Sequence, residues 1–178
     1  MLPSEKARSK KDHSVTTAAP VAAPAPAPTD PIPGPGAPIR LRPHHVLCIL
    51  TFLGKGYTPG FTVNMNAVVR RLAAGAEIEV VTGPDDICAP LLVEQEQPHC
   101  HRESVTARDD RAAADVARLL QTPIQPGARL VLTAERLRQL RNAYAAGPLR
   151  GACSGCDWSD LCAAVANAGF SGAVLQIP

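Results

Sequence analysis

Three cysteines near the C-terminus constrain the fold of this chain more than any other feature. Cys153 and Cys156 form a Cys-x-x-Cys pair, and Cys162 follows six residues later. A Cys-x-x-Cys turn places both sulfurs on one side and points its backbone N–H groups at them. Ordinary packing gives no reason for this spacing, whereas ligation does. The chain is therefore predicted to fold around a metal ion or an iron–sulfur cluster.

The third cysteine is predicted to lie on a C-terminal helix. We expect this helix to begin with Asp157 as its cap and to end at Gly169. Cys162 then lies little more than one turn from Cys156, so three sulfurs converge before any long-range contact forms. Burial beside Trp158 would shield the site from water and tune the potential of a cluster. The predicted inward stripe consists of Trp158, Leu161, Cys162 and Val165.

The composition divides the chain into a tail and one domain. Half of the 18 prolines precede Ile39, in a Pro/Ala-rich stretch that has little to bury. Residues 1–38 are therefore expected to be an extended, disordered tail. Basic residues in this tail precede no apolar run, so a secretory signal is not expected. Residues 39–178 are long enough to form a single domain with its own core.

The pattern of apolar residues predicts a mainly helical, small single-domain α+β fold. An apolar helix over 43–53 is expected to be buried at the centre, and the segment 87–101 is expected to be a loop. A strand is predicted over 77–80 and a second one over 130–132. Further helices are predicted over 58–75, 104–120, 133–147 and 157–169. The metal or cluster site would join the central loop to the C-terminal helix.

A fourth ligand must come from outside the C-terminal motif. Cys88 and Cys100, with eleven residues between them in the expected loop, are the main candidates. Asp85 and Asp86 precede Cys88 and can cap a short turn there. Their negative charges would oppose a thiolate-rich site, so we expect both to point to solvent or to backbone donors. The predicted ligand set is Cys88, Cys100, Cys153, Cys156 and Cys162.

Other cysteine and histidine residues are weaker candidates. His44 and Cys48 are four residues apart on the expected central helix, so both can reach one site. Cys48 can equally be a small apolar core residue, and His44 and His45 can bond loop backbone at the helix start. His99 and His101 flank Cys100 and are either donors near the site or partly exposed loop residues.

The arrangement of the cysteines favours an iron–sulfur cluster over zinc. Thiolates suit both, but structural zinc usually uses two Cys-x-x-Cys-like pairs of ligands. Only one such close pair, Cys153 and Cys156, is present. Three close cysteines with a distant fourth are commoner around a cluster, and [4Fe–4S] is favoured over [2Fe–2S]. The spacing from Cys88 to Cys100 loosely resembles thioredoxin-like [2Fe–2S] ferredoxins. The long gap to Cys153 and the x2 pair depart from that pattern. Zinc stays as the alternative.

A series of short segments along the domain matches a known family in order. These segments are Arg40-Leu41-Arg42-Pro43-His44-His45, Cys48, Gly54-Lys55-Gly56-Tyr57, Gly83-Pro84-Asp85-Asp86-Ile87-Cys88, His99-Cys100, Arg108-Asp109, Cys153, Cys156, Trp158 and Cys162. Together they resemble the bacterial and archaeal proteins of domain of unknown function 1284. The resemblance runs from Ile39 to about Phe170 and implies an iron–sulfur-binding protein whose cysteines act as one set. It gives no substrate and no partner.

Charge and motif content limit the function classes. The net charge is +2, the domain carries 14 basic and 13 acidic residues, and there are six aromatics, so nucleic-acid binding is not expected. No apolar run is long enough to span a bilayer. Six cysteines in a reducing cytoplasm are better explained as ligands than as disulfides.

Three functions are consistent with this sequence. The first is ferredoxin-like electron transfer or redox sensing with a redox partner protein. The second is a structural zinc module that presents a protein-binding surface. The third is an enzyme with Cys48 or Cys100 as nucleophile and a neighbouring histidine as base. No nucleophile elbow, phosphate loop or zinc-protease motif is present, so no catalytic residue is assigned.

Overall fold

The computed structural model describes residues 36–178. The mainly helical α+β character is confirmed, whereas the prediction for residues 1–35 of the tail lies outside the described residues. The elements follow one another along the chain as β1 (Ile39–Leu41), α1 (His45–Thr51), α2 (Pro59–Ala73), β2 (Glu77–Val80), α3 (Ala89–Glu94), the 3-10 helix η1 (His99–His101), α4 (Glu103–Leu120), β3 (Arg129–Val131), α5 (Ala134–Ala146), the 3-10 helix η2 (Arg150–Cys153) and α6 (Ser159–Asn167).

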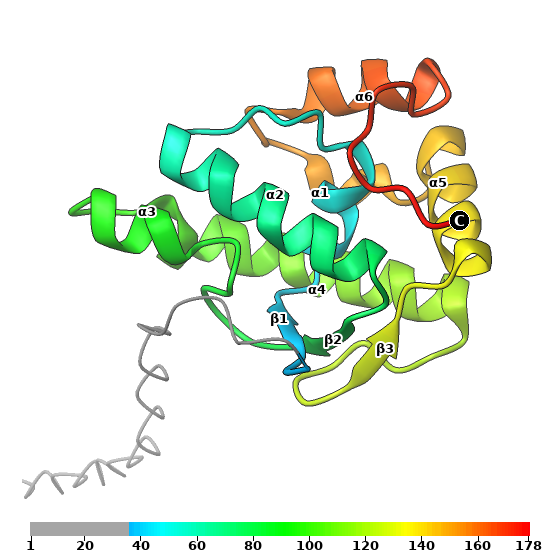
Figure 1. Cartoon of the computed structure of the whole chain (residues 1–178), viewed down its shortest axis with the longest axis horizontal. Helices are drawn as coiled ribbons and strands as arrows, with labels where there is room; N and C mark the ends of the chain where they lie inside the picture. The colour runs from blue at the N-terminus through cyan, green and yellow to red at the C-terminus, as the bar shows by residue number, and fades with distance from the viewer. Residues whose placement is uncertain (1–35) are drawn as a thin grey trace, which may run out of the picture.

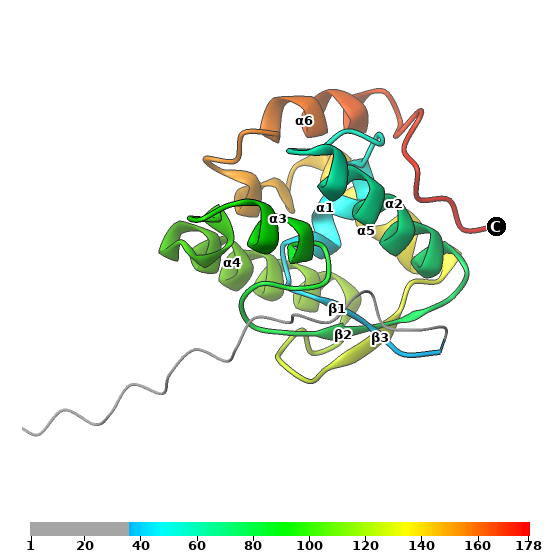
Figure 2. The same ribbon diagram turned by 60° about the vertical axis from the view of Figure 1, so that its left-hand side comes forward.

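A small mixed sheet forms one end of the domain, and α6 lies at the opposite end (Figures 1 and 2). The strand order is β1-β2-β3. β1 and β2 are parallel, with Ile39 opposite Ile78, and β3 is antiparallel to β2, with Leu130 opposite Ile78. These three side chains are buried on the face that packs against the helices. The sheet therefore closes the core at the end that is remote from the C-terminal cysteines.

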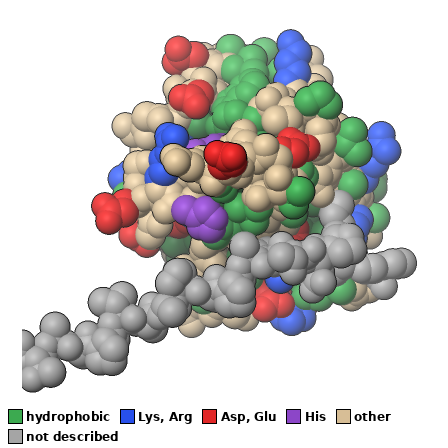
Figure 3. Space-filling view, turned by 90° about the vertical axis from the view of Figure 1, so that its left-hand side faces the viewer, with side chains coloured by type: hydrophobic (Ala, Val, Ile, Leu, Met, Phe, Trp, Pro, Cys, Tyr) green, Lys and Arg blue, Asp and Glu red, His purple; other side chains and the backbone are tan. Residues whose placement is uncertain are grey.

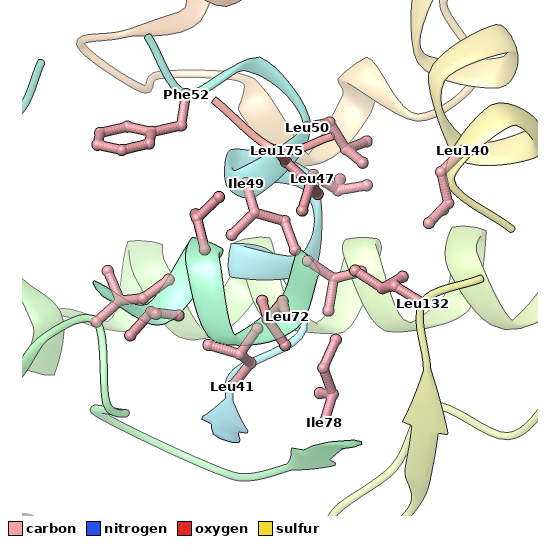
Figure 4. Close-up of a cluster of buried hydrophobic side chains, with 14 of the residues drawn as sticks. Leu41, Leu47, Ile49, Leu50, Phe52, Leu72, Ile78, Leu132, Leu140 and Leu175 are labelled. Atoms are coloured by element: carbon pink, nitrogen blue, oxygen red, sulfur yellow. The ribbon is translucent and has the colours of Figure 1, made fainter. Parts of the chain in front are cut away.

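Helix α1 lies at the centre of the molecule, as its apolar sequence predicts. All of its residues except Cys48 are buried, and it contacts both α5 and α6. In Figure 4 its side chains Leu47, Ile49 and Leu50 lie among buried groups from the surrounding elements. Burial of a leucine or isoleucine stabilises the fold by roughly 1.5–3 kcal/mol. This buried helix thus carries His45 and Cys48 into the interior.

The predicted starts of α2 and α5 are confirmed by their caps. The Thr58 hydroxyl accepts a hydrogen bond from the backbone N–H of Phe61 at 3.0 Å, and Pro59 begins the helix. The Thr133 hydroxyl accepts from the N–H of Arg136 at 3.2 Å. No helix formed by residues 36–178 has both the length and the apolar character needed to cross a bilayer.

Several local predictions were wrong. Residues 87–101 are not all loop, because they contain α3 and η1, two elements too short to show helical periodicity. The described residues form three strands rather than one or two, since the three-residue β1 is too short to show alternation. α6 begins without a side-chain cap from Asp157. Leu161 is 37% exposed, because only part of this short end helix faces the domain.

Candidate metal centre

One cavity collects most of the chemistry-bearing side chains of the described domain. It has a volume of about 100 Å³, several times the space that one water molecule needs. His101 is exposed and does not line it. The cavity lies between α1, η1 and the segment from η2 to α6, and its donor side chains are Cys48, Cys88, Cys100, Cys153, Cys156, Cys162, His44, His45 and His99.

The C-terminal motif forms a turn followed by a helix, as predicted. The N–H of Cys156 donates to the carbonyl of Cys153 at 3.0 Å, and the N–H of Cys162 donates to the carbonyl of Trp158 at 2.9 Å within α6. Gly155 has a φ of +70°, a conformation that favours glycine. Arg108 on α4 donates to the Gly155 carbonyl at 2.7 Å. A side chain from the middle of the domain therefore holds the turn in place.

Cys48 from α1 faces these three cysteines. Burial raises the pKa of its thiol well above the ordinary value, and negative charge on Cys162, Cys156 and Cys153 raises that pKa further. All four cysteines also line the same cavity. The sequence pattern alone favours Cys88 and Cys100 over Cys48, because a lone cysteine in an apolar helix resembles a core residue. The structure brings it to the C-terminal motif.

Two hydroxyl groups contact the sulfurs of this group. The Tyr144 hydroxyl lies 3.3 Å from the Cys153 sulfur. Burial raises the pKa of Cys153, and the Tyr144 hydrogen bond opposes that rise. Burial likewise raises the pKa of Cys162, opposed by a hydrogen bond from Thr51. Buried thiols of this kind stay protonated unless a cation compensates the charge of the thiolate.

Cys88 and Cys100 form a second sulfur group in the same cavity. They are 2% and 3% exposed, and their side chains hydrogen-bond to each other. The hydrogen bond from Cys88 lowers the pKa of Cys100, and the positive charges of His45 and Arg42 act in the same direction. The same hydrogen bond, together with burial, raises the pKa of Cys88. The two thiols therefore titrate as a coupled pair, in which ionisation of one opposes ionisation of the other.

A buried carboxylate holds His44 from behind. The His44 Nδ1 lies 2.7 Å from Asp109 Oδ1. Arg42 donates from Nε and Nη2 to Asp109 Oδ2 at 2.8 and 2.6 Å, and from Nη1 to the Cys100 carbonyl at 2.8 Å. Burial, and then the neighbouring His45, lowers the pKa of His44 to about 4. The ring is therefore neutral at physiological pH, and Arg42 supplies the charge opposite Asp109.

Asp85 holds His45 in the same manner. Its Oδ2 lies 2.7 Å from the His45 Nδ1 and accepts from the Arg42 N–H at 2.8 Å. Its Oδ1 accepts from the N–H groups of Ile87 and Cys88 at 3.0 and 3.1 Å. The expected contact with backbone donors is confirmed, but Asp85 is fully buried and does not point to solvent.

Asp86 points away from the cavity residues and binds Arg40. Its Oδ2 accepts from the Arg40 N–H at 2.8 Å, and its Oδ1 pairs with the Arg40 guanidinium at 2.9 Å. The carboxylate is 2% exposed as a side chain, so of the two expected orientations Asp86 adopts the one toward a backbone donor. The two adjacent aspartates thus bind different partners. Asp86 binds Arg40 of β1, and Asp85 binds the ring of His45, which lines the cavity.

These contacts leave the Nε2 atoms of both histidines available. Each Nδ1 is directed at a carboxylate, an arrangement that fixes the tautomer and orientation of metal-binding histidines. One ligand atom each from His44, His45 and Cys48 lie within 4.8 Å of one another, and the same holds for His45, Asp85 and Cys88. The alternative that His44 and His45 bond loop backbone was wrong for their rings, which bond carboxylates instead.

An aromatic cluster covers one side of the cavity. The Tyr57 ring lies 5.5 Å from the Phe61 ring, 4.8 Å from the His99 ring and 5.5 Å from the Trp158 ring, measured between centroids. All four side chains line the cavity. The predicted position of Trp158 beside the cysteines is confirmed, whereas Tyr57 was not predicted. Burial raises the pKa of the Tyr57 hydroxyl, so it stays protonated.

Sequence reasoning also missed Arg42 and Asp109. Arg42 is 1% exposed, a rare state for arginine unless it is paired. The sequence does hold a sign of this burial, because Arg42 lies between the apolar residues of β1 and those of α1. Asp109 belongs to a segment that carries the family resemblance, but nothing in the sequence pairs it with Arg42, which lies 67 residues away.

One face of the described domain is mixed in charge. In the face shown in Figure 3, histidine side chains reach the surface, and Lys and Arg groups are interspersed with Asp and Glu groups. Val93 and Val63 are 88% and 71% exposed. Scattered exposed apolar residues of this kind are ordinary on protein surfaces.

Comparison with known proteins identifies the family. Neither the curated proteins nor the solved structures contain a significant match. The model of the family described as protein of unknown function (DUF1284) matches residues 56–162, more than half of the chain. The matched segment contains Cys88, Cys100 and the C-terminal motif, and it begins after Cys48. The chain therefore belongs to the DUF1284 family.

Proposed function

We propose that this protein binds one [4Fe–4S] cluster and exchanges single electrons with a redox partner protein in the cytoplasm. Cys153, Cys156 and Cys162 are three of the proposed ligands, and Cys48 is the fourth. The observation that carries the proposal is the placement of Cys48 on α1 against the C-terminal motif within one cavity. Four thiolates from two segments are the usual ligand set of such a cluster.

The spacing of the sulfurs supports a cluster over a single zinc ion. Tetrahedral zinc with Zn–S bonds of about 2.3 Å requires sulfurs about 3.8 Å apart. Among the described residues, no three of these four cysteines have sulfurs that all lie within 4.8 Å of one another. A cluster spreads its ligands more widely than one ion does.

The surrounding side chains suit a buried redox centre. When bound, a cluster of this type supplies one-electron transfer. The Tyr144 and Thr51 hydroxyls contact two of the sulfurs, and such hydrogen bonds raise the reduction potential by stabilising the more negative state. Tyr57 and Trp158 cover the cavity and limit access of water and oxygen.

The fourth ligand can be tested by matched substitutions. We propose Cys48 as the fourth ligand. The prediction that Cys88 or Cys100 supplies the fourth ligand is the alternative that the substitutions test. We expect Cys48→Ser to reduce the iron and acid-labile sulfide of anaerobically purified protein, whereas Cys88→Ser and Cys100→Ser retain both. Cluster loss in Cys88→Ser with retention in Cys48→Ser would reverse the assignment. Stoichiometric zinc without sulfide in the wild-type protein would instead support the structural zinc module.

A further inference from the structure

We propose that the cluster-free protein binds one divalent transition-metal ion at His44, His45 and Cys48. Two imidazole nitrogens and one thiolate sulfur are its ligands, and the fourth position of the ion faces the cavity. The site goes beyond the proposed function, because the proposed cluster uses neither histidine. It shares Cys48 with that cluster, so the ion and the cluster exclude each other if the proposed function holds.

The three ligand atoms already lie close together. One ring nitrogen of each histidine and the Cys48 sulfur all lie within 4.8 Å of one another. Bonds of about 2.0–2.3 Å to a tetrahedral ion require donor atoms about 3.3–3.7 Å apart. The three atoms therefore have to approach by at most about 1.5 Å, a distance that side-chain rotations can supply. Among residues 36–178, the four proposed cluster cysteines contain no group of three that meets the same limit.

Both histidine rings are already oriented for metal binding. They line the cavity, with centroids 4.3 Å apart. The His44 Nδ1 lies 2.7 Å from Asp109 Oδ1, and the His45 Nδ1 lies 2.7 Å from Asp85 Oδ2. In the part of the chain that the structure describes, no residue hydrogen-bonds to the Nε2 atom of either ring. A metal-ligating histidine almost always has its other nitrogen held by a carboxylate, a backbone carbonyl or water, as here.

The charge of Asp85 indicates a cation at this place. Its carboxylate is fully buried, and three backbone N–H groups bond it without adding net charge. Of the described residues, only His45 forms an ion pair with it, and that ring is charged only when protonated. Asp109, by contrast, pairs with the permanent charge of Arg42. A buried carboxylate without a permanent cation is costly, and a divalent ion on the His45 ring offsets that cost.

The ligand chemistry fits a divalent ion of borderline softness. Imidazole nitrogens and a thiolate together suit zinc, ferrous iron and cobalt. When the ion binds, the Cys48 thiol releases its proton to solvent. The Cys48 thiolate and the Asp85 carboxylate then carry two negative charges, which equal the charge of the ion. Three protein ligands with an open fourth position are typical of zinc sites that also bind water or a small ligand.

Cobalt titration of the full-length, cluster-free protein tests this site. Co²⁺ replaces zinc in sites of this kind and gives thiolate-to-cobalt charge-transfer absorption. We expect the wild-type protein to bind one equivalent of Co²⁺ with this absorption. His45→Gln and Cys48→Ser should abolish the binding, and Asp85→Asn should lower the affinity about 10–100-fold. Binding should be retained in Cys153→Ser and in His99→Ala, which removes another histidine that lines the cavity.

X-ray absorption of wild-type protein loaded with one equivalent of zinc needs no variant. The expected first shell contains one sulfur donor, two imidazole nitrogens and one further nitrogen or oxygen donor. Absence of stoichiometric Co²⁺ and Zn²⁺ binding would overturn the proposal, as would a first shell of sulfur alone. Co²⁺ binding that survives His45→Gln but is lost in Cys153→Ser would also overturn it, since the ion would then lie at the cluster cysteines.

Cluster reconstitution of the cobalt-loaded protein separates failure of this site from failure of the cluster. Anaerobic addition of iron and sulfide should release one Co²⁺ for each cluster formed, because both metals need Cys48. Protein that forms the cluster but binds no Co²⁺ in its cluster-free state would overturn the ion site alone. Protein that binds Co²⁺ with the expected ligands but takes up no sulfide would support the ion site and overturn the cluster alone.

Discussion

Replacement of Arg42 should destabilise the domain more than any exposed charge substitution. Its side chain is 1% exposed and makes three hydrogen bonds, two to Asp109 and one to the Cys100 carbonyl. Arg42→Met keeps much of the volume but leaves a buried carboxylate without its cation. Breaking a buried ion pair in this way costs roughly 3–5 kcal/mol. We expect a loss of unfolding free energy in that range.

Arg129 offers a matched control. Its guanidinium also bridges two carboxylates, those of Glu77 and Glu79, both at 2.9 Å, but its side chain is 50% exposed. Solvent screening reduces such a pair to about 0–1 kcal/mol. Urea unfolding of metal-free protein under anaerobic conditions should therefore separate Arg42→Met from Arg129→Met by at least about 2 kcal/mol. Equal losses would refute the role assigned to Arg42.

The pH dependence of the same variant gives a second measurement. Although burial opposes ionisation, hydrogen bonds from His44 and Arg42 lower the pKa of Asp109 to about 2. Because this pKa lies below that of an aspartate in the unfolded chain, the ionised Asp109 stabilises the fold above about pH 4. This stabilisation is lost as the pH falls through about 2. Without Arg42 the pKa of Asp109 rises, so acid unfolding of Arg42→Met should begin at higher pH.

Three further predictions concern other parts of the cavity wall. Since burial lowers the pKa of His44 to about 4, acidification of metal-free protein from pH 6.5 to 4 should lower its free energy of unfolding by about 3 kcal/mol. Urea unfolding at several pH values should show a smaller loss in His44→Gln. Gly56→Ala should lower the free energy of unfolding, measured by heat or urea, by about 1–3 kcal/mol, because the new Cβ would overlap the Phe61 ring. Gly151→Ala is the control: its Cβ would have no atom within 4 Å, so the free energy of unfolding should not change. Tyr57→Ala should speed loss of cluster absorbance in air at least severalfold, since it uncovers the cavity; an unchanged rate would contradict a shielding role.

Local signals predicted the framework of this fold. Thr58 and Thr133 predicted the starts of α2 and α5 because a cap involves residues only a few positions apart. The Cys153–Cys156 turn was predictable for the same reason. By contrast, β1 and α3 are three and six residues long, and neither is long enough to show a period.

The candidate site was predictable only in part, because its completion depends on tertiary contacts. The C-terminal motif indicated ligation, but the approach of Cys48 depends on how α1 packs against α6. The Arg42–Asp109 pair joins residues 67 positions apart, and the bond from Asp85 to His45 spans 40. Spacing along the chain carries no information on such pairs. The buried carboxylates behind the histidines are therefore a finding of the structure.

Chemical analysis of the anaerobically purified protein tests the central claim most directly. Iron, acid-labile sulfide and zinc should be measured per chain, together with electron paramagnetic resonance of the dithionite-reduced sample. A single [4Fe–4S] cluster predicts about four cluster irons and about four sulfides, with a signal from the reduced cluster. Protein that holds no sulfide and gives no such signal, even after anaerobic reconstitution with iron and sulfide, would contradict the account.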